Sequence, residues 1–374
     1  MKTRNRKTSL IILLLTLITV LPSCNANSIG AMAESGLITR IHNMTASRAA
    51  HTATLLPDGK VLVTGGFTGG SSLASTEIFD PATQAFTTAS NMSVARSGHS
   101  ATLLSNGKVL IAGGYNGNYL ASAELYDPST NGFTPVSTMT TARSGHVATL
   151  LPNGKVLLAG GVGTGWTFLA NAELYDPVSN AFTTTGAMLT ARESHTATLL
   201  NNGKVLITGG HRGRHPAITI YSSAEIYDPA MGAFTAAGDM TRIRHKHEAV
   251  LLADGRVLII GGSDERDGNG AYVSAEIYDP VKNSFRATGN MNSPRYKLQG
   301  TAMLLSNGKV LVAGGANRAE IFDPAANTFS YVAGDMETPR LFATATRLTS
   351  GQILITGGYH GNVIVTSNAW VYRG

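Results

Sequence analysis

Seven Gly-Gly pairs divide this chain at nearly regular intervals. They fall at residues 65–66, 113–114, 160–161, 209–210, 261–262, 314–315 and 357–358, with steps of 43 to 53 residues. A period of this size indicates a repeat architecture, in which one supersecondary unit recurs and each copy buries its apolar faces against its neighbours. The sequence therefore predicts a scaffold of similar units. We expect the residues that determine its function at the positions where the units differ.

Each unit contains four short apolar runs separated by turn residues. In the second copy these runs are residues 101–104, 108–112 and 123–126, followed by a run around Phe133. Asn-Gly or Asp-Gly joins the first two runs in six copies, which favours a two-residue β-hairpin with a type I′ turn and positive φ at both residues. Asp-Pro ends the third run, where the missing N–H of proline stops the sheet. A unit of four antiparallel strands is typical of a propeller blade.

The Gly-Gly pairs, the aromatic-Asp-Pro triplets and the Phe that follows them resemble the kelch repeat over about nine tenths of the chain. Many kelch repeats carry Trp where this chain has Phe. The resemblance implies an all-β, seven-bladed β-propeller of four-stranded antiparallel blades over residues 36–374. The last copy ends in its third run, whereas an unpaired apolar run at 37–41 precedes the first copy. We expect this N-terminal strand to complete the last blade and remove the exposed edges.

Residues 1–23 are typical of an export signal. Four cations precede a twelve-residue apolar run at 10–21, which is too short to span a membrane. The segment 21–24, Leu-Pro-Ser-Cys, resembles the lipobox of bacterial lipoproteins, in which the cysteine is acylated. Because Cys24 is the only cysteine, no internal disulfide can form. We expect residues 24–35 to be a tether and the protein to lie in a bacterial cell envelope, as an outer-membrane lipoprotein or in the periplasm, or to be secreted; a cleaved signal without an anchor is the alternative.

Two sets of charged side chains recur once per unit. An Arg follows each Met by four residues, and a Glu lies in the third run of six units, with Trp370 in its place in the seventh. We expect buried Arg–Glu pairs that hold the scaffold together. Five units carry a histidine three residues after the Arg, at His51, His99, His146, His195 and His247, and these should ring one mouth of the central channel. We favour hydrogen bonds from these rings to loop backbone over a shared metal, because equivalent positions are a blade's width apart.

Ligand binding is expected where the repeats disagree. The loops after Gly-Gly and the segments between units emerge on one face, because successive strands alternate in direction. Aromatic rings mixed with charges there suit a glycan or a protein surface. The candidate ligand-binding residues are Tyr115, Tyr119, Trp166, His211, Arg212, Arg214, Arg242 and Tyr272. The same loops carry Lys246, Asp267, Lys297 and Tyr359.

We therefore expect a monomeric interaction module for a protein or glycan ligand, attached to a membrane only through a lipid, with no cofactor, metal or catalytic residue assigned. Removing the four leader cations takes the net charge from +6 to about +2, which gives no long-range field for nucleic acid. One alternative is a carbohydrate-active enzyme similar to kelch sialic-acid mutarotases, although those have six blades. Another is a structural envelope component. The kelch enzyme galactose oxidase needs a Cys linked to a Tyr, and Cys24 lies in the leader.

Overall fold

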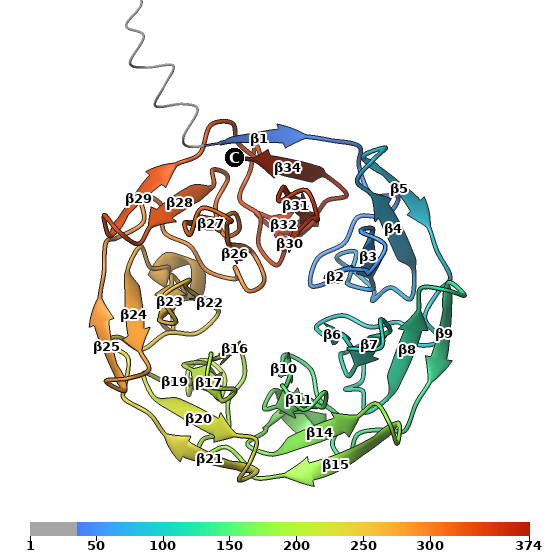
Figure 1. Cartoon of the computed structure of the whole chain (residues 1–374), viewed down its shortest axis with the longest axis horizontal. Helices are drawn as coiled ribbons and strands as arrows, with labels where there is room; N and C mark the ends of the chain where they lie inside the picture. Colours follow the sequence, from blue (N-terminus) through green and yellow to red (C-terminus); the bar gives the residue numbers. More distant parts are fainter. Residues whose placement is uncertain (1–35) are drawn as a thin grey trace, which may run out of the picture.

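The computed structural model describes residues 36–374 and shows seven four-stranded antiparallel sheets arranged radially around a central channel (Figure 1). Apart from two short 3-10 turns, the described residues form strands, loops and turns. The predicted all-β seven-bladed propeller is confirmed. The signal, Cys24 and the tether lie outside the described residues. In the part that is described, no helix has the length and apolar character needed to cross a membrane.

Each blade is ordered from its innermost strand at the channel to its outermost strand at the rim. The first three blades are β2 (Thr52–Leu55), β3 (Val61–Thr64), β4 (Thr76–Asp80) and β5 (Ala85–Thr88); β6 (Ser100–Leu103), β7 (Val109–Ala112), β8 (Ala123–Asp127) and β9 (Gly132–Pro135); and β10 (Val147–Leu150), β11 (Val156–Ala159), β14 (Ala172–Asp176) and β15 (Ala181–Thr185).

The remaining blades follow the same order. They are β16 (Thr196–Leu199), β17 (Val205–Thr208), β20 (Ala224–Asp228) and β21 (Ala233–Ala236); β22 (Glu248–Leu251), β23 (Val257–Ile260), β24 (Ala275–Asp279) and β25 (Ser284–Ala287); β26 (Ala302–Leu304), β27 (Val310–Val312), β28 (Glu320–Asp323) and β29 (Thr328–Tyr331); and β30 (Thr344–Arg347), β31 (Ile353–Thr356), β34 (Ala369–Arg373) and β1 (Leu37–Arg40).

The loops after the Gly-Gly pairs contain short elements. They are the ribbons β12 (Val162–Gly163) with β13 (Thr167–Phe168), β18 (His211–Arg212) with β19 (Thr219–Ile220) and β32 (Tyr359–His360) with β33 (Ile364–Val365), and the 3-10 turns η1 (Thr164–Trp166) and η2 (Asp267–Gly270).

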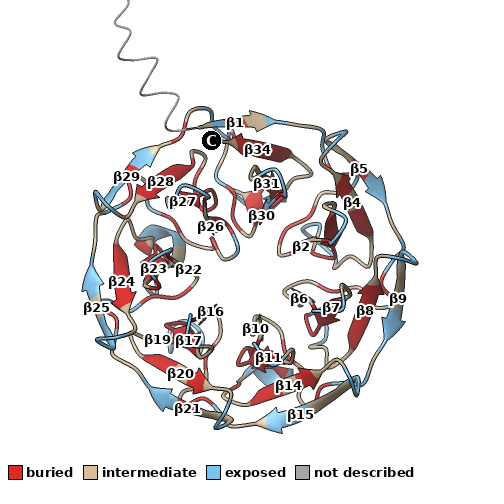
Figure 2. Ribbon diagram, in the orientation of Figure 1, coloured by how far each residue is buried: buried red, intermediate tan, exposed pale blue. Residues whose placement is uncertain are grey.

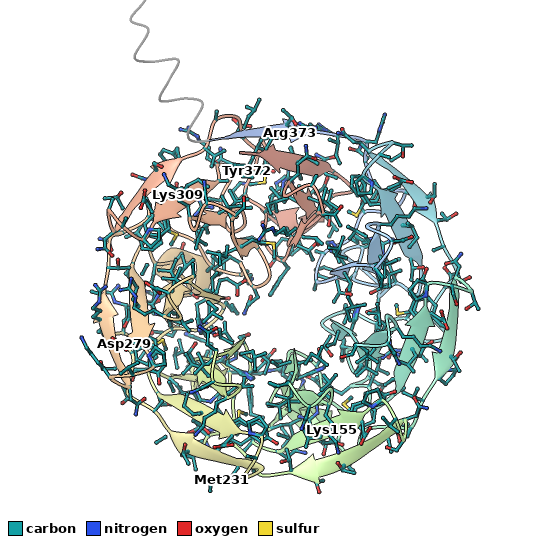
Figure 3. The ribbon with its side chains drawn as sticks, in the orientation of Figure 1. Lys155, Met231, Asp279, Lys309, Tyr372 and Arg373 are labelled. Carbon is teal, nitrogen blue, oxygen red and sulfur yellow. The ribbon has the colours of Figure 1, made fainter. Side chains whose placement is uncertain are left out.

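The two ends of the described chain close the ring. β1 pairs antiparallel with β34, in a register that sets Leu37 opposite Arg373 and Arg40 opposite Trp370. Tyr372 and Arg373, labelled in Figure 3, lie at this junction. Ile38 is 3% exposed and packs in the core between the sixth and seventh blades. The predicted closure by an N-terminal strand is confirmed.

Burial follows the radial order of the strands. The second strand of each blade is buried on both faces, whereas the outermost strands carry most of the exposed strand residues (Figure 2). The aromatic side chain before each Asp-Pro packs on the Phe of the outer strand, with ring centroids 4.7 to 5.0 Å apart in six blades. The apolar core therefore lies between neighbouring blades, as expected for units that cannot bury their faces alone.

The hairpin turn between the first two strands differs from the prediction. Gly107 has φ of 81°, but Asn106 is not in the left-handed region. Gly107 N–H donates to Leu104 O and Leu104 N–H donates to Lys108 O, which makes a three-residue loop whose final glycine is left-handed. The type I′ assignment was wrong because the Asn106 side chain accepts the Lys108 N–H and stabilises a right-handed turn residue instead.

The repeated arginine connects neighbouring blades. The Arg96 backbone bonds the first blade through Leu73 O and Gly66 N–H, and its guanidinium bonds the second blade. All six predicted Arg–Glu pairs are buried, with N–O distances of 2.6 to 2.9 Å. In the seventh blade Arg340 instead stacks 4.6 Å over the Trp370 ring and donates to Met336 O.

The Gly-Gly pairs make this contact possible. A Cβ at Gly65 would lie 2.5 Å from Arg96 O and 2.8 Å from Cε1 of His99, both from the next blade. A Cβ at Gly66 would lie 2.7 Å from Ala49 O in its own blade. The expectation that these glycines let backbones approach closely is therefore confirmed.

Candidate functional site

A ring of backbone hydrogen bonds surrounds one mouth of the channel. The residue two positions after each repeated arginine has φ between 49° and 63°. We call these seven residues the mouth ring: Ala50, Gly98, Gly145, Ser194, Lys246, Lys297 and Phe342. Each N–H donates to the carbonyl of the ring residue in the neighbouring blade at 2.9 to 3.1 Å, except at one step. The ring fixes the backbone at the mouth while its side chains vary.

The predicted histidines stand directly behind this ring, and four of them line the cavity described below. Their hydrogen bonds differ from the expectation. The Nε2 atoms of His51, His99, His146 and His247 meet Ser or Thr hydroxyls of the preceding blade, not loop backbone, at 2.9 to 3.3 Å. Burial, reinforced by the nearby arginine, lowers the pKa of His51 and of His146 to about 3. These rings are therefore neutral at pH 7 and hold blades together.

A cavity of about 460 Å³ occupies the channel at this mouth. Its lining comes from the mouth ring, the histidines and the innermost strands of several blades, and it includes Glu193, His195, Gln299 and Phe342. The volume falls within the roughly 300–1,000 Å³ typical of small-molecule sites. Among the described residues no group of three or more His, Cys, Asp or Glu side chains is placed to hold a metal ion.

A polar cluster lies beside the cavity on the fourth and fifth blades. His211 Nε2 is 3.6 Å from Glu193 Oε2, and His211 Nδ1 is 3.2 Å from Nδ1 of His245. His245 Nε2 is 3.5 Å from Asp267 Oδ1, which also accepts Nζ of Lys246 at 2.5 Å. Burial raises the pKa of Glu193 to about 7 and lowers the pKa of His211 to about 4. At neutral pH these histidines are uncharged, and Glu193 is poised between its two forms.

Four of the candidate residues form one continuous surface, which we call the aromatic shelf: Tyr115, Tyr119, Trp166 and Arg214. The ring centroid of Tyr119 lies 5.2 Å from that of Tyr115 and 5.9 Å from that of Trp166, in a T-shaped arrangement with the indole. The Arg214 guanidinium stacks over the Trp166 ring. Trp166 is 49% exposed and Tyr115 39% exposed. The shelf spans the loops of the second, third and fourth blades.

The other candidates do not join the shelf. His211 is buried in the polar cluster. The Arg212 side chain is exposed and makes no hydrogen bond or ion pair with another described residue. Arg242 stacks 4.7 Å over the Tyr272 ring and forms a separate pair at the fifth blade.

Sequence reasoning placed Lys297 and Tyr359 in the loops of this face but missed Tyr296 and Phe342. Tyr296, Phe342 and Tyr359 place their rings 5.0 to 5.7 Å from Nζ of Lys297, which also donates to the Tyr359 hydroxyl at 2.8 Å. Glu193 and His245 were missed as well. The available signal was the position one or two residues after the repeated arginine, which holds small residues in the first three blades and large ones from the fourth onward.

These features define the protein class as a seven-bladed β-propeller with a recessed mouth on its loop face. Three segments match the kelch motif, at residues 48–93, 95–140 and 249–292, so this seven-bladed propeller contains kelch motifs.

A fungal alcohol oxidase of the AA5 family, solved in complex with copper, superposes with a TM-score of 0.73 at 19% identity, covering 91% of this chain and 76% of that one. At this identity the likeness shows the fold alone. Over 149 residues the chain is 28% identical to the dynein alpha chain of the flagellar outer arm from Chlamydomonas reinhardtii. That match covers 36% of this chain and 3% of the dynein chain.

Proposed function

We propose that this protein is a recognition module that binds a glycan or protein ligand on its loop face. The observation that carries the proposal is the aromatic shelf, in which side chains from three consecutive blades form one exposed surface. Trp166 has φ of 63°, a backbone conformation that costs about 1–2 kcal/mol in a non-glycine residue. A large apolar ring held exposed at such a cost favours binding over simple solvation.

The chemistry of the shelf suits two ligand classes. Exposed aromatic faces stack on the C–H faces of sugars, while Arg214 and the tyrosine hydroxyls offer hydrogen bonds. Tyr, Trp and Arg are also the residues most enriched among the energetic centres of protein interfaces. The kelch propeller fold suits either role, because its loops vary while the blades stay fixed.

The proposed location is the bacterial cell envelope, with the protein anchored through an acylated Cys24 on a short tether or released without it. The leader sequence and the lone cysteine support this proposal. Metabolic labelling with a fatty acid, followed by membrane fractionation, tests it. Cys24→Ala should lose both the label and the membrane association, and an unlabelled wild-type protein would contradict the anchor.

A matched pair of arginines makes the binding experiment specific. Arg212 and Arg214 lie in the same loop and carry the same charge, but only Arg214 stacks on Trp166. We expect Trp166→Ala and Arg214→Ala to weaken binding on a glycan array or in pull-downs of an identified partner from envelope extract. Arg212→Ala should not. Met231, labelled at the rim in Figure 3, is 74% exposed in the turn between β20 and β21, so Met231→Ala is a second control. Equal binding by all four variants would contradict the assignment.

A carbohydrate-active enzyme is the second candidate, favoured by one observation. Glu193 lines the cavity with its pKa raised by burial to about 7, which is the range of a general acid or base working at neutral pH. Turnover of a bound sugar that Glu193→Gln abolishes without weakening binding would support this candidate. Binding without turnover leaves recognition as the function.

A further inference from the structure

Three departures from the repeat pattern coincide at the seam between the third and fourth blades. The first is in the mouth ring. Six of the seven ring steps carry a backbone hydrogen bond, but Ser194 N–H makes none to Gly145 O among the described residues. A donor and an acceptor of the ring are thus left without their usual partners where the cavity begins.

The second departure is at His195. Other histidines of this set meet a hydroxyl of the preceding blade, as His99 meets Thr52 and Thr64. In the third blade the equivalent positions are Val147 and Ala159, which have no hydroxyl. Neither His195 ring nitrogen has a hydrogen-bond partner in good geometry, and the Ala159 backbone is the polar group that the third blade offers it. His195 lines the cavity and is only 3% exposed.

The third departure is the Glu193 side chain. A Cβ at Gly145 would lie 2.7 Å from Oε1 of Glu193, so the carboxylate lies across the mouth ring. No N–H or O–H of the described residues donates a hydrogen bond to it, and the imidazole of His211, which is neutral at pH 7, lies 3.6 Å away. Gln299, on another wall of the cavity, has a buried Oε1 that also lacks a donor. Buried polar groups without partners are costly, so the His195 ring and the Gln299 oxygen, which lie around one cavity with the partly exposed Glu193 carboxylate, indicate a ligand.

We propose that Glu193, His195 and Gln299 form a subsite in the channel mouth for a neutral, polyhydroxylated ring, such as the terminal hexopyranose of a glycan. The inference rests on the proposed recognition function and specifies where the end of the ligand is held. Sugar hydroxyls donate to the carboxylate and to the amide oxygen. The imidazole, neutral when buried, either donates to a hydroxyl or accepts from one.

Charge at the mouth favours a neutral ligand over an ion. Glu193 repels an anion. A cation would face Lys246 and Arg214, both close enough to Glu193 to lower its pKa against the effect of burial. A hydroxyl group satisfies the unpartnered atoms without adding charge, and Phe342 in the same lining offers an apolar face to the ring carbons.

The test uses the full folded domain and a panel of methyl hexopyranosides, with n-butylammonium chloride and sodium acetate as charged probes of similar reach, in saturation-transfer NMR titrations. We expect at least one glycoside to bind. Glu193→Ala should weaken that binding by at least about tenfold, the loss of one hydrogen bond to a charged group.

Val147→Thr is the decisive variant because it is nearly isosteric and supplies the hydroxyl that Thr52 supplies to His99. Val147→Thr should raise the melting temperature, because its hydroxyl gives the His195 ring a hydrogen-bond partner. It should also weaken glycoside binding. Thr208→Ala is the matched control. It removes one hydroxyl from His247, which does not line the cavity. This control should lower the melting temperature and leave glycoside binding within about twofold.

The outcomes separate this subsite from the proposed function. If no glycoside binds, if a charged probe binds more tightly than every glycoside, or if Glu193→Ala and Val147→Thr bind as wild type does, the subsite is refuted. Binding of larger ligands that depends on Trp166 and Arg214 would still stand in each of these cases. If glycoside binding depends on Glu193 while Trp166→Ala leaves array binding unchanged, the subsite holds and the shelf assignment fails.

Discussion

Breaking one buried ion pair should reveal how far the repeated arginines stabilise the propeller. The Glu124 carboxylate accepts Arg96 Nη2 at 2.9 Å and the backbone N–H groups of Ser93 and Val94 at 2.8 and 3.3 Å. Arg96 and Glu124 are at most 1% exposed. Glu124→Ala leaves a buried guanidinium without its counter-charge and two N–H groups without an acceptor. Removing one partner of a buried pair costs about 3–5 kcal/mol.

This free energy converts into a measurable shift. With about 2.1 cal/mol/K of unfolding entropy per residue, a domain of this size loses roughly 1.4 °C of melting temperature per kcal/mol if it unfolds as one unit. Glu124→Ala should therefore lower the melting temperature in calorimetry by about 4–7 °C. Glu124→Gln keeps a hydrogen-bond acceptor but no charge, so its melting temperature should lie between those of the wild type and Glu124→Ala.

The control is an exposed pair in the same blade. Lys108 and Asp127 lie 3.0 Å apart with side chains 41% and 26% exposed, so Lys108→Ala should cost less than about 1 kcal/mol. If Glu124→Ala melts within a degree of wild type, or no lower than Lys108→Ala, the arginine does not join the blades in the way that the geometry indicates.

Three further predictions follow from the fold. Deleting residues 36–43 removes the β1 ladder and exposes the buried Ile38 site, which should cost about 5 kcal/mol or more and lower the melting temperature by many degrees; an unchanged melt would contradict closure by β1. Gly113→Ala places a Cβ 2.6 Å from Arg143 O, whereas Gly165→Ala meets nothing within 4 Å at the same φ of 66°. Urea denaturation should therefore show a larger loss for Gly113→Ala, and equal losses would mean that backbone strain alone matters. Acid should also destabilise the fold. Because burial lowers the pKa of His146 from 6.5 to about 3, the unfolded state binds the extra proton. The contribution of the neutral His146 ring to the free energy of unfolding is therefore complete above pH 6.5. It declines by about 1.4 kcal/mol per pH unit as the pH falls toward 3. Urea midpoints at pH 7.5, 6 and 5 should fall, and His146→Gln should reduce that slope; an identical slope in the variant would count against neutral burial.

The architecture could be predicted from sequence because the information is repeated seven times. Gly-Gly, Asp-Pro and the arginine each recur at fixed offsets, so an accidental match at one copy is outweighed by the others. The unpaired run at 37–41 then located the closing strand, because six complete copies defined what the seventh lacked. The hairpin turn was mispredicted because both turn types place a left-handed glycine after Asn106, and they differ only in the conformation of Asn106 itself.

The site was only partly predictable, for a reason that lies in the same repeats. Trp166 and Arg214 stood out because they lie in loops of irregular length. Glu193 and His245 are adjacent to repeated arginines, in a segment that the pattern assigns to the scaffold. Whether such neighbours point outward or toward the channel depends on the left-handed residue that follows each of them, and nothing in the sequence marks Lys246 or Phe342 as left-handed.

The mouth ring explains how one segment serves both as scaffold and as variable surface. Its hydrogen bonds use backbone atoms only, so the position of each ring residue does not depend on its side chain. The left-handed conformation costs about 1–2 kcal/mol for each residue other than glycine. Hydrogen bonds to neighbouring ring residues offset that cost, one for Ser194 and two for each of the other non-glycine members. Gly98 and Lys297 can therefore occupy equivalent positions in one ring. Among the described residues, the one missing bond of the ring falls between Gly145 and Ser194, beside Glu193 and His195. A propeller of this kind can change its ligand by substitution at the mouth without changing how its blades pack.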